Sequence, residues 1–283
     1  MAGPDKRLHA WRADLAETSL KGRVESARFT DGVVKQLRTP VASLRRTPDA
    51  LSMQVTEVLM GERLRVLDEK DGWAWVKLEA DGYVGYVDAT ALRAEVLQAT
   101  HEVATLSTLV YPKADLKSQP AHMIPMLAEL TVIAEEKDYL LLATGGYVFA
   151  KHVRPLHSGI GDFVDVAERF LFAPYYWGGK TIRGLDCSGL VQVSFNAVGW
   201  PSLRDSDMQE ETLGTVLPES QHASLRRGDL VFWDAHVGIM ADAENLLHAN
   251  GHHMMVAIEP LKAANERIAA KGKPITKIRR LSV

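Results

Sequence analysis

The chain of 283 residues is longer than a single hydrophobic core usually supports, so two or three domains are expected. Its hydrophobic content of 46% and charged content of 24% are ordinary for globular proteins, and a formal net charge of −3 gives no sign of nucleic-acid binding. The single cysteine excludes an intrachain disulfide framework, so packed cores must hold the chain together.

The N-terminal segment has no export pattern. Residues 1–11 lack the uninterrupted apolar stretch of a signal peptide, and no run of about 18 apolar residues occurs in the sequence. These features predict a cytoplasmic protein that does not bind membranes. Residues 1–32 are predicted to form a short helical or extended arm ahead of the first domain.

A weak internal repeat follows the arm. The segment that begins at Met60 matches the segment that begins at Met126, with apolar residues at corresponding positions. Alternating apolar residues and Asp-Gly pairs at 71–72 and 81–82 predict small twisted β-meanders. The two copies resemble bacterial SH3-like barrels, and this resemblance implies a first barrel at 33–94 and a second at 95–156.

The two copies differ at their Gly-Tyr-Val segments. The first copy carries a second tyrosine, Tyr86, where the second copy has Ala150. Packing inside the barrel would explain Tyr83 and Tyr86 as well as a functional role would. The missing tyrosine of the second copy predicts that this barrel is a structural spacer.

Residues 157–283 begin with a glycine-containing linker and a helix predicted over residues 162–172, whose apolar side chains share one face. The tetrapeptide Asp-Cys-Ser-Gly at 186–189 then opens a second, amphipathic helix. Asp186 is a good N-cap, and the positive end of the helix would stabilise a thiolate at Cys187. Cys187 is therefore interpreted as a nucleophile and not as a small buried hydrophobe.

Short apolar runs bounded by Gly, Asp and Asn come next and predict strands joined by tight turns. His236 begins one run and His248 lies in the following run, so a hairpin near Asp242 could place the two side by side. His236 would then accept the proton of Cys187, while His248 would hold the other ring nitrogen of His236. Asn250 is an alternative for the orienting role.

The other histidines form no zinc-ligand pattern. Those that are scattered along the chain are His101, His122, His152, His157 and His222. The adjacent His252 and His253 would point to opposite faces of a strand and are interpreted as surface residues. No metal and no cofactor are predicted.

Several motifs in order make residues from about 163 to the C-terminus resemble the NlpC-type papain-like cysteine peptidases of cell walls. They are Pro-Tyr-x-Trp-Gly-Gly at 174–179, Asp-Cys-Ser-Gly at 186–189, Arg-Asp-Ser-x-x-Gln at 204–209, Arg-Gly-Asp-Leu-Val-Phe-Trp at 227–233, His-Val-Gly-Ile at 236–239 and Leu-Leu-His-Ala at 246–249. The resemblance implies two small all-β SH3-like barrels followed by an α+β papain-like peptidase domain at 157–283. It also implies that Cys187 is the nucleophile, His236 the base and His248 the orienting residue.

The same resemblance implies the substrate, a murein tripeptide or tetrapeptide cut at the γ-D-glutamyl–L-diamino acid bond. In family members with two SH3-like domains and no export signal, the first barrel covers part of the groove and selects a free N-terminal L-alanine. With the absent signal, this predicts recycling of imported wall fragments. The substrate-binding residues implied by the resemblance are Tyr83, Tyr175, Asp186, Ser188, Asp205 and Ser206.

Other functions stay open at this point. A papain-like amidase or acyltransferase would keep the thiol and change the bond, although a lipid acyltransferase would want a hydrophobic anchor that the sequence lacks. A non-catalytic protein that binds wall peptides is a third alternative, against which the set of Cys187, His236 and His248 argues. The sequence does not reveal the diamino acid or the preferred stem length.

Overall fold

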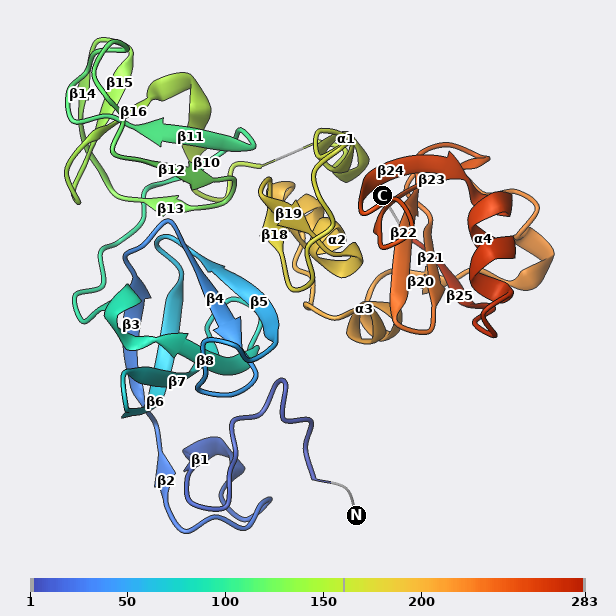
Figure 1. The fold of residues 1–283 in the computed structure, drawn as a ribbon, viewed down its shortest axis with the longest axis horizontal. Coiled ribbons are helices and arrows are strands. Elements are labelled where there is room, and N and C mark those ends of the chain that lie inside the picture. Colours follow the sequence, from blue (N-terminus) through green and yellow to red (C-terminus); the bar gives the residue numbers. More distant parts are fainter. Residues whose placement is uncertain (1–2, 160, 282–283) are drawn as a thin grey trace. The chain divides into compact units, whose positions relative to one another are not determined.

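The computed structural model describes residues 3–159 and 161–281 (Figure 1). The chain divides into two compact units, with the boundary between His157 and Ser158. Over the part of the chain that is described, no helix has both the length and the apolar character needed to cross a membrane.

An antiparallel sheet with strand order β5-β4-β8-β7-β6-β3-β9 lies in the first unit. Its strands are β3 (Val33–Leu37), β4 (Val41–Arg45), β5 (Gln54–Leu59), β6 (Arg63–Lys70), β7 (Trp73–Leu78), β8 (Val84–Asp88) and β9 (Leu92–Arg93), with the 3-10 turn η2 (Ala89–Ala91) before the last. Strands β6 and β7 meet at Asp71-Gly72, whose φ angles of 52° and 82° are those of a tight hairpin turn. The meander predicted from this Asp-Gly pair is confirmed.

The residues ahead of this sheet form an extended arm. Strand β1 (Ala16–Glu17) pairs in parallel with β2 (Phe29–Thr30), and a 3-10 turn, η1 (Thr18–Leu20), follows β1. Leu15 is buried in a cluster with Trp75 of β7. The arm is therefore packed onto the sheet through apolar side chains.

A second β-rich region of the first unit covers residues 101–155. Its strands are β10 (His101–Val103), β11 (Ser107–Val110), β12 (His122–Pro125), β13 (Glu129–Leu130), β14 (Val132–Glu136), β15 (Tyr139–Leu142), β16 (Tyr147–Phe149) and β17 (Val153–Pro155), with the 3-10 turn η3 (Ala150–His152). These strands pair in small antiparallel sheets around a core that includes Val103, Ile124 and Val148. Met60, which follows β5, packs into the same core, so the two β-rich regions share apolar contacts.

The second unit is built on an antiparallel sheet with strand order β20-β25-β21-β22-β23-β24. Its strands are β20 (Thr215–Val216), β21 (Leu230–Trp233), β22 (His236–Met240), β23 (Asn245–Asn250), β24 (Met255–Pro260) and β25 (Ile275–Arg280). The helical elements are α1 (Phe163–Glu168), α2 (Cys187–Ala197), α3 (Ser206–Thr212), η4 (Glu219–Gln221) and α4 (Leu261–Ala269). Figure 1 shows α2 on one side of the sheet and α4 on the other, the arrangement of an α+β domain.

Helix α2 is buried along nearly its whole length. Phe195 packs against the rings of Phe163 and Trp200, with ring centroids 4.6 and 5.7 Å away. The helix begins at the predicted Asp186 cap and is closed by Gly199, whose φ of +81° suits glycine. A helix held this firmly gives its first residue a fixed position.

Helix α1 is shorter than the predicted range of 162–172. Phe172 lies outside it, with a φ of +68° and a side chain that is 77% exposed. Its backbone N–H donates to the carbonyl of Val256 in β24. Pairing with the sheet edge therefore ends the helix early and leads the chain toward the small hairpin of β18 (Lys180–Thr181) and β19 (Gly184–Leu185).

Candidate active site

Cys187 is the first residue of α2 and is 8% exposed. The carboxylate of Asp186 accepts a hydrogen bond of 2.7 Å from the backbone N–H of Gly189, which is the predicted N-cap. The backbone N–H groups of Ser188 and Val237 donate hydrogen bonds to the sulfur. Because Val237 follows His236, strand β22 is in contact with the thiol.

The thiol is neutral in this environment. Burial raises the pKa of Cys187 to about 12, and the negative charge of Asp186 adds to the increase, while Arg204 and the two backbone donors oppose it. Burial therefore opposes the thiolate that the helix N-terminus was predicted to stabilise. A base must take the proton as the sulfur attacks.

His236 and His248 lie on the neighbouring antiparallel strands β22 and β23, as the hairpin pattern predicted. Nε2 of His236 is 2.8 Å from Nδ1 of His248. The connecting turn is closed by Asp242, whose carboxylate accepts from the backbone N–H groups of Glu244 and Asn245. Nδ1 of His236 is then the ring nitrogen that remains for the thiol proton.

A carboxylate that sequence reasoning missed extends this chain of contacts. Nε2 of His248 is 2.9 Å from Oε1 of Glu259 in β24, and Glu259 is ion-paired through both oxygens with Arg267 of α4. The register pairs His248 with Ala257, so Glu259 is its diagonal neighbour on the same face. A lone acidic residue at a strand end carries no sequence signal, and only the register reveals it.

Both imidazoles are neutral at pH 7. Burial lowers the pKa of His236 to about 3, and the neighbouring His248 and Arg267 lower it further. Burial likewise lowers the pKa of His248 to about 4, against the opposing effect of Glu259. Partial burial would raise the pKa of Glu259, but its bonds to Arg267 and His248 bring it to about 2, so this carboxylate is ionised.

Asn250 does not take the orienting position. Its amide oxygen accepts from the backbone N–H groups of His252 and His253, at 3.1 and 2.8 Å, and so closes the turn after β23. The expectation that His252 and His253 point to opposite faces is wrong, because their rings meet in this turn with centroids 4.7 Å apart. His253 is half-buried, with Nδ1 at 3.8 Å from Oε1 of Glu259.

A metal ion could find ligand atoms here. One atom each from His248, His253 and Glu259 lies within 4.8 Å of the other two. Arg267 contacts both oxygens of Glu259, and its fixed positive charge disfavours a cation at the same carboxylate. The geometry therefore favours the hydrogen-bonded chain over a metal centre.

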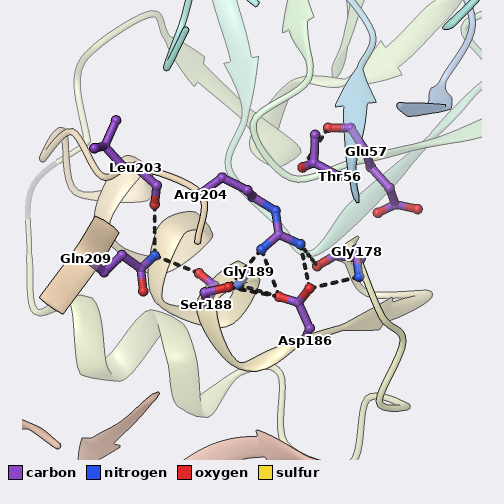
Figure 2. Close-up of polar contacts among 10 residues, drawn as sticks. Thr56, Glu57, Gly178, Asp186, Ser188, Gly189, Leu203, Arg204 and Gln209 are labelled. Carbon is purple, nitrogen blue, oxygen red and sulfur yellow. Dashed lines mark hydrogen bonds and ion pairs between the residues drawn. The ribbon is translucent and has the colours of Figure 1, made fainter. Parts of the chain in front are cut away.

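Asp186 and Ser188, two of the predicted substrate-binding residues, lie in a closed polar cluster (Figure 2). The Asp186 carboxylate accepts from the backbone N–H groups of Gly178 and Gly189, at 2.8 and 2.7 Å, and from Arg204 at 2.9 and 2.7 Å. Arg204 also donates to the Ser188 hydroxyl at 2.9 Å. These donors fill the acceptor positions of the carboxylate. The charge of Asp186 is therefore already paired inside the protein without substrate, and the substrate-binding role of Asp186 stays a prediction.

Gln209 supports the same helix start. Its amide nitrogen donates to the carbonyl oxygens of Ser188 and Leu203, at 3.0 and 2.9 Å (Figure 2). Arg204 and Gln209 belong to the Arg-Asp-Ser-x-x-Gln motif, but their roles could not be assigned from sequence. In the structure, the motif braces the first turn of α2 and therefore the position of Cys187.

The remaining predicted substrate-binding residues are placed as follows. Burial raises the pKa of Tyr175, and the charges of Cys187 and Asp186 add to the increase. The hydroxyl of Tyr175 therefore lies near the start of α2. Asp205 precedes α3 without capping it through its side chain, and Ser206 begins that helix; both are half-buried. Tyr83 belongs to the first unit and is 4% exposed. Its role in a substrate groove stays a prediction.

Comparison with known proteins places these domains in a family. The NlpC/P60 family model matches residues 173–268, and the model of the bacterial dipeptidyl-peptidase Sh3 domain matches residues 44–92. Dipeptidyl-peptidase 6 of Lysinibacillus sphaericus is 25% identical over 74% of this chain and 85% of its own length. Gamma-D-glutamyl-L-lysine dipeptidyl-peptidase of Bacillus subtilis is 26% identical over 69% of this chain and 71% of its own length.

A crystal structure of an NlpC/P60 family protein from Bacillus cereus has the same fold. It superposes with a TM-score of 0.74 at 20% identity and covers 88% of this chain and 99% of the other. The fold, the family models and the relatives agree. The chain therefore contains an NlpC/P60 domain, with an SH3 domain of the bacterial dipeptidyl-peptidase type ahead of it.

Proposed function

We propose that this protein is a cysteine peptidase that cleaves the γ-D-glutamyl–L-diamino acid bond of peptidoglycan stem peptides. The observation that carries the proposal is the hydrogen-bonded chain from Glu259 through His248 to His236, which ends on strand β22, the strand that contacts the thiol of Cys187 at the start of α2. Relatives named gamma-D-glutamyl-L-lysine dipeptidyl-peptidase support this bond as the target.

The reaction proposed for this geometry begins with a neutral thiol and a neutral imidazole. Nδ1 of His236 takes the proton of Cys187 as the sulfur attacks the γ-carbonyl carbon of D-glutamate. The imidazolium then protonates the leaving amine, and the bond between carbon and nitrogen breaks to leave a thioester. Water, deprotonated by His236, hydrolyses the thioester and releases the dipeptide and the thiol. As the first residue of α2, Cys187 has a backbone N–H without an intrahelical acceptor, which suits the oxyanion.

On the substrate side, we propose that Tyr175, Asp205 and Ser206 line the subsite for the N-terminal L-alanine. Asp205, at the start of α3, is the carboxylate of the Arg-Asp-Ser-x-x-Gln motif that we assign to the substrate ammonium. The cytoplasmic location and the role in recycling wall fragments stay predictions from the sequence.

For the domain organisation, we propose an arm at 1–32, SH3-like domains at 33–94 and 95–156, and the peptidase domain at 157–283. The apolar core of the region at 101–155, to which Met60 is the contribution of the preceding region, supports a second SH3-like domain.

The function is tested by incubating the protein with L-Ala-γ-D-Glu-diaminopimelate, and with the corresponding lysine peptide, and measuring release of L-Ala-D-Glu by mass spectrometry. Cys187→Ser changes one atom at a helix start and should abolish release while leaving the unfolding curve unchanged. His236→Ala should lower kcat by about 10²- to 10⁴-fold, the usual contribution of a general base, and His248→Gln should cost less.

Three results would overturn the proposal. Near-wild-type turnover in Cys187→Ser would remove the nucleophile. Peptide binding by the wild-type protein without release of dipeptide from either peptide would favour a non-catalytic binder, whereas release of another fragment would favour an amidase of different specificity.

A further inference from the structure

We propose that Glu259, held by Arg267, is a positioning residue that fixes the protonated nitrogen of both histidines and so leaves Nδ1 of His236 unprotonated. The inference rests on the proposed function, in which this nitrogen is the base. It concerns a carboxylate that the nucleophile, base and orienting histidine do not include. Its contacts are with His248 and with helix α4, and not with the thiol.

The assignment follows from counting donors and acceptors along the chain. An ionised carboxylate only accepts, so Nε2 of His248 must carry the hydrogen that it donates to Glu259. A neutral imidazole has one N–H, and Nδ1 of His248 is therefore an acceptor. Nε2 of His236, 2.8 Å away, must then be the donor, which leaves the lone pair of His236 on Nδ1.

Without the carboxylate, the opposite arrangement becomes available. His248 could carry its hydrogen on Nδ1 and donate it to Nε2 of His236. The hydrogen of His236 would then sit on Nδ1, where a base needs a lone pair. The two arrangements have the same number of hydrogen bonds between the rings, so the acceptor at the far end decides between them.

The surroundings make this control effective. The side chain of His248 is fully buried and that of Glu259 is 10% exposed. Solvent water therefore cannot readily replace the carboxylate as the hydrogen-bond acceptor for Nε2 of His248. Arg267 contacts both oxygens of Glu259 from α4, which fixes the carboxylate in place. The imidazole of His253 is 3.8 Å from Oε1 and is itself bound to Asn250 at 3.1 Å.

Arg267 also separates a positional role from an electrostatic one. The positive charge of Arg267 offsets the negative charge of Glu259. The ion pair therefore has little net electrostatic effect on the imidazolium that forms during catalysis. A neutral acceptor in the same place should therefore serve almost as well. Glu259→Gln supplies such an acceptor, whereas Glu259→Met keeps a similar volume and supplies none.

The first experiment measures steady-state kinetics of dipeptide release. Glu259→Met should lower kcat by about 10- to 100-fold with little change in KM, the range found for residues that orient a reacting group from behind. Glu259→Gln should recover most of this loss. The matched control is Glu266→Met in α4, whose side chain is 67% exposed and pairs with Lys262 at 3.9 Å, and it should leave kcat unchanged. Equal losses in the Gln and Met variants would overturn the positional role.

The second experiment reads the protonated nitrogens directly, by ¹⁵N NMR of the histidine rings in the full chain without substrate. The wild-type protein should show N–H at Nε2 of both His236 and His248, and Glu259→Met should move hydrogen to Nδ1. Unchanged ring signals in Glu259→Met would overturn the inference. If the single variant does not fold, the double variant Glu259→Met, Arg267→Met removes the unpaired cation and gives the same readout.

The two experiments fail separately. A shift of the ring protons in a protein that cleaves no peptide would uphold the inference about Glu259 and overturn the proposed function. Cleavage that is insensitive to Glu259→Met, with unchanged ring signals, would do the reverse.

Discussion

The NlpC/P60 unit contains two ion pairs of the same chemical type next to its candidate catalytic residues. Asp186 and Arg204 meet beside Cys187, and Glu259 and Arg267 meet beside His248. In each, one guanidinium contacts both oxygens of one carboxylate. They differ in what else the carboxylate binds.

The remaining bonds of Asp186 come from the backbone N–H groups of Gly178 and Gly189 and from the Ser188 hydroxyl, and Arg204 is 1% exposed. The remaining bond of Glu259 goes to an imidazole, and Arg267 is 23% exposed. An ion pair whose carboxylate also binds backbone N–H groups holds the fold around a nucleophile. An ion pair whose carboxylate binds a titratable ring can instead determine which ring nitrogen carries the proton.

The largest expected effect is on the free energy of unfolding, which should differ between substitutions in the two ion pairs. Asp186→Asn should lower the free energy of unfolding by about 3–5 kcal/mol, because it removes the charge of the carboxylate that binds both terminal nitrogens of the buried Arg204. Asparagine caps helices as well as aspartate does, so the change isolates the charge. Glu259→Gln should cost about 1 kcal/mol or less, because Arg267 can turn toward water.

Urea unfolding followed by tryptophan fluorescence would measure both variants. Equal losses of unfolding free energy in the two variants would contradict this prediction, since they would show that burial of the arginine does not determine how much stability is lost.

The second prediction concerns acid. The pKa values of His236 and His248 in the folded protein, about 3 and about 4, lie below the unfolded value near 6.5. The unfolded chain therefore binds more protons between these limits, and stability should be full above about pH 6.5 and fall as the pH is lowered toward 4. Each histidine can contribute up to about 1.4 kcal/mol per pH unit. The charged and titratable groups that act on the pair are Glu259, Arg267, His253 and Lys273.

Unfolding curves recorded at intervals from pH 4 to pH 8 would give this slope. His248→Gln should have a shallower acid slope than the wild-type protein, because one neutral buried histidine is gone. A slope that does not depend on His248 would assign the acid sensitivity to other groups.

The smallest expected effect concerns substrate recognition. It tests which residue binds the peptide N-terminus if Asp186 serves only to stabilise the start of α2. Acetylation of the N-terminal L-alanine should lower kcat/KM by at least about tenfold, the size of one charge-assisted contact. Asp205→Asn should narrow this difference in kcat/KM between free and acetylated peptides, and Asp207→Asn, an exposed change in the first turn of α3, should not.

Comparable kcat/KM for the free and acetylated peptides would show a groove that is open at its amino end. The proposed recycling role would then lose its main support.

Much of the site could be predicted from the sequence because its signals are local. An aspartate before a helix reads as an N-cap, and Asp186 caps α2. A turn rich in Asp and Asn between two apolar runs reads as a hairpin, and His236 and His248 lie on adjacent strands. Each inference depends on residues a few positions apart, whose geometry the backbone restricts strongly.

Tertiary structure decided the features that depend on residues far apart in the chain. The protonation state of Cys187 follows from how much water packing removes, which no helix end reports. Arg204, which lies in a separate loop, forms an ion pair with Asp186, and strand register places Glu259 beside His248. A one-residue shift of that register would turn Glu259 to the other face of the sheet, so its place depends on how the whole sheet packs.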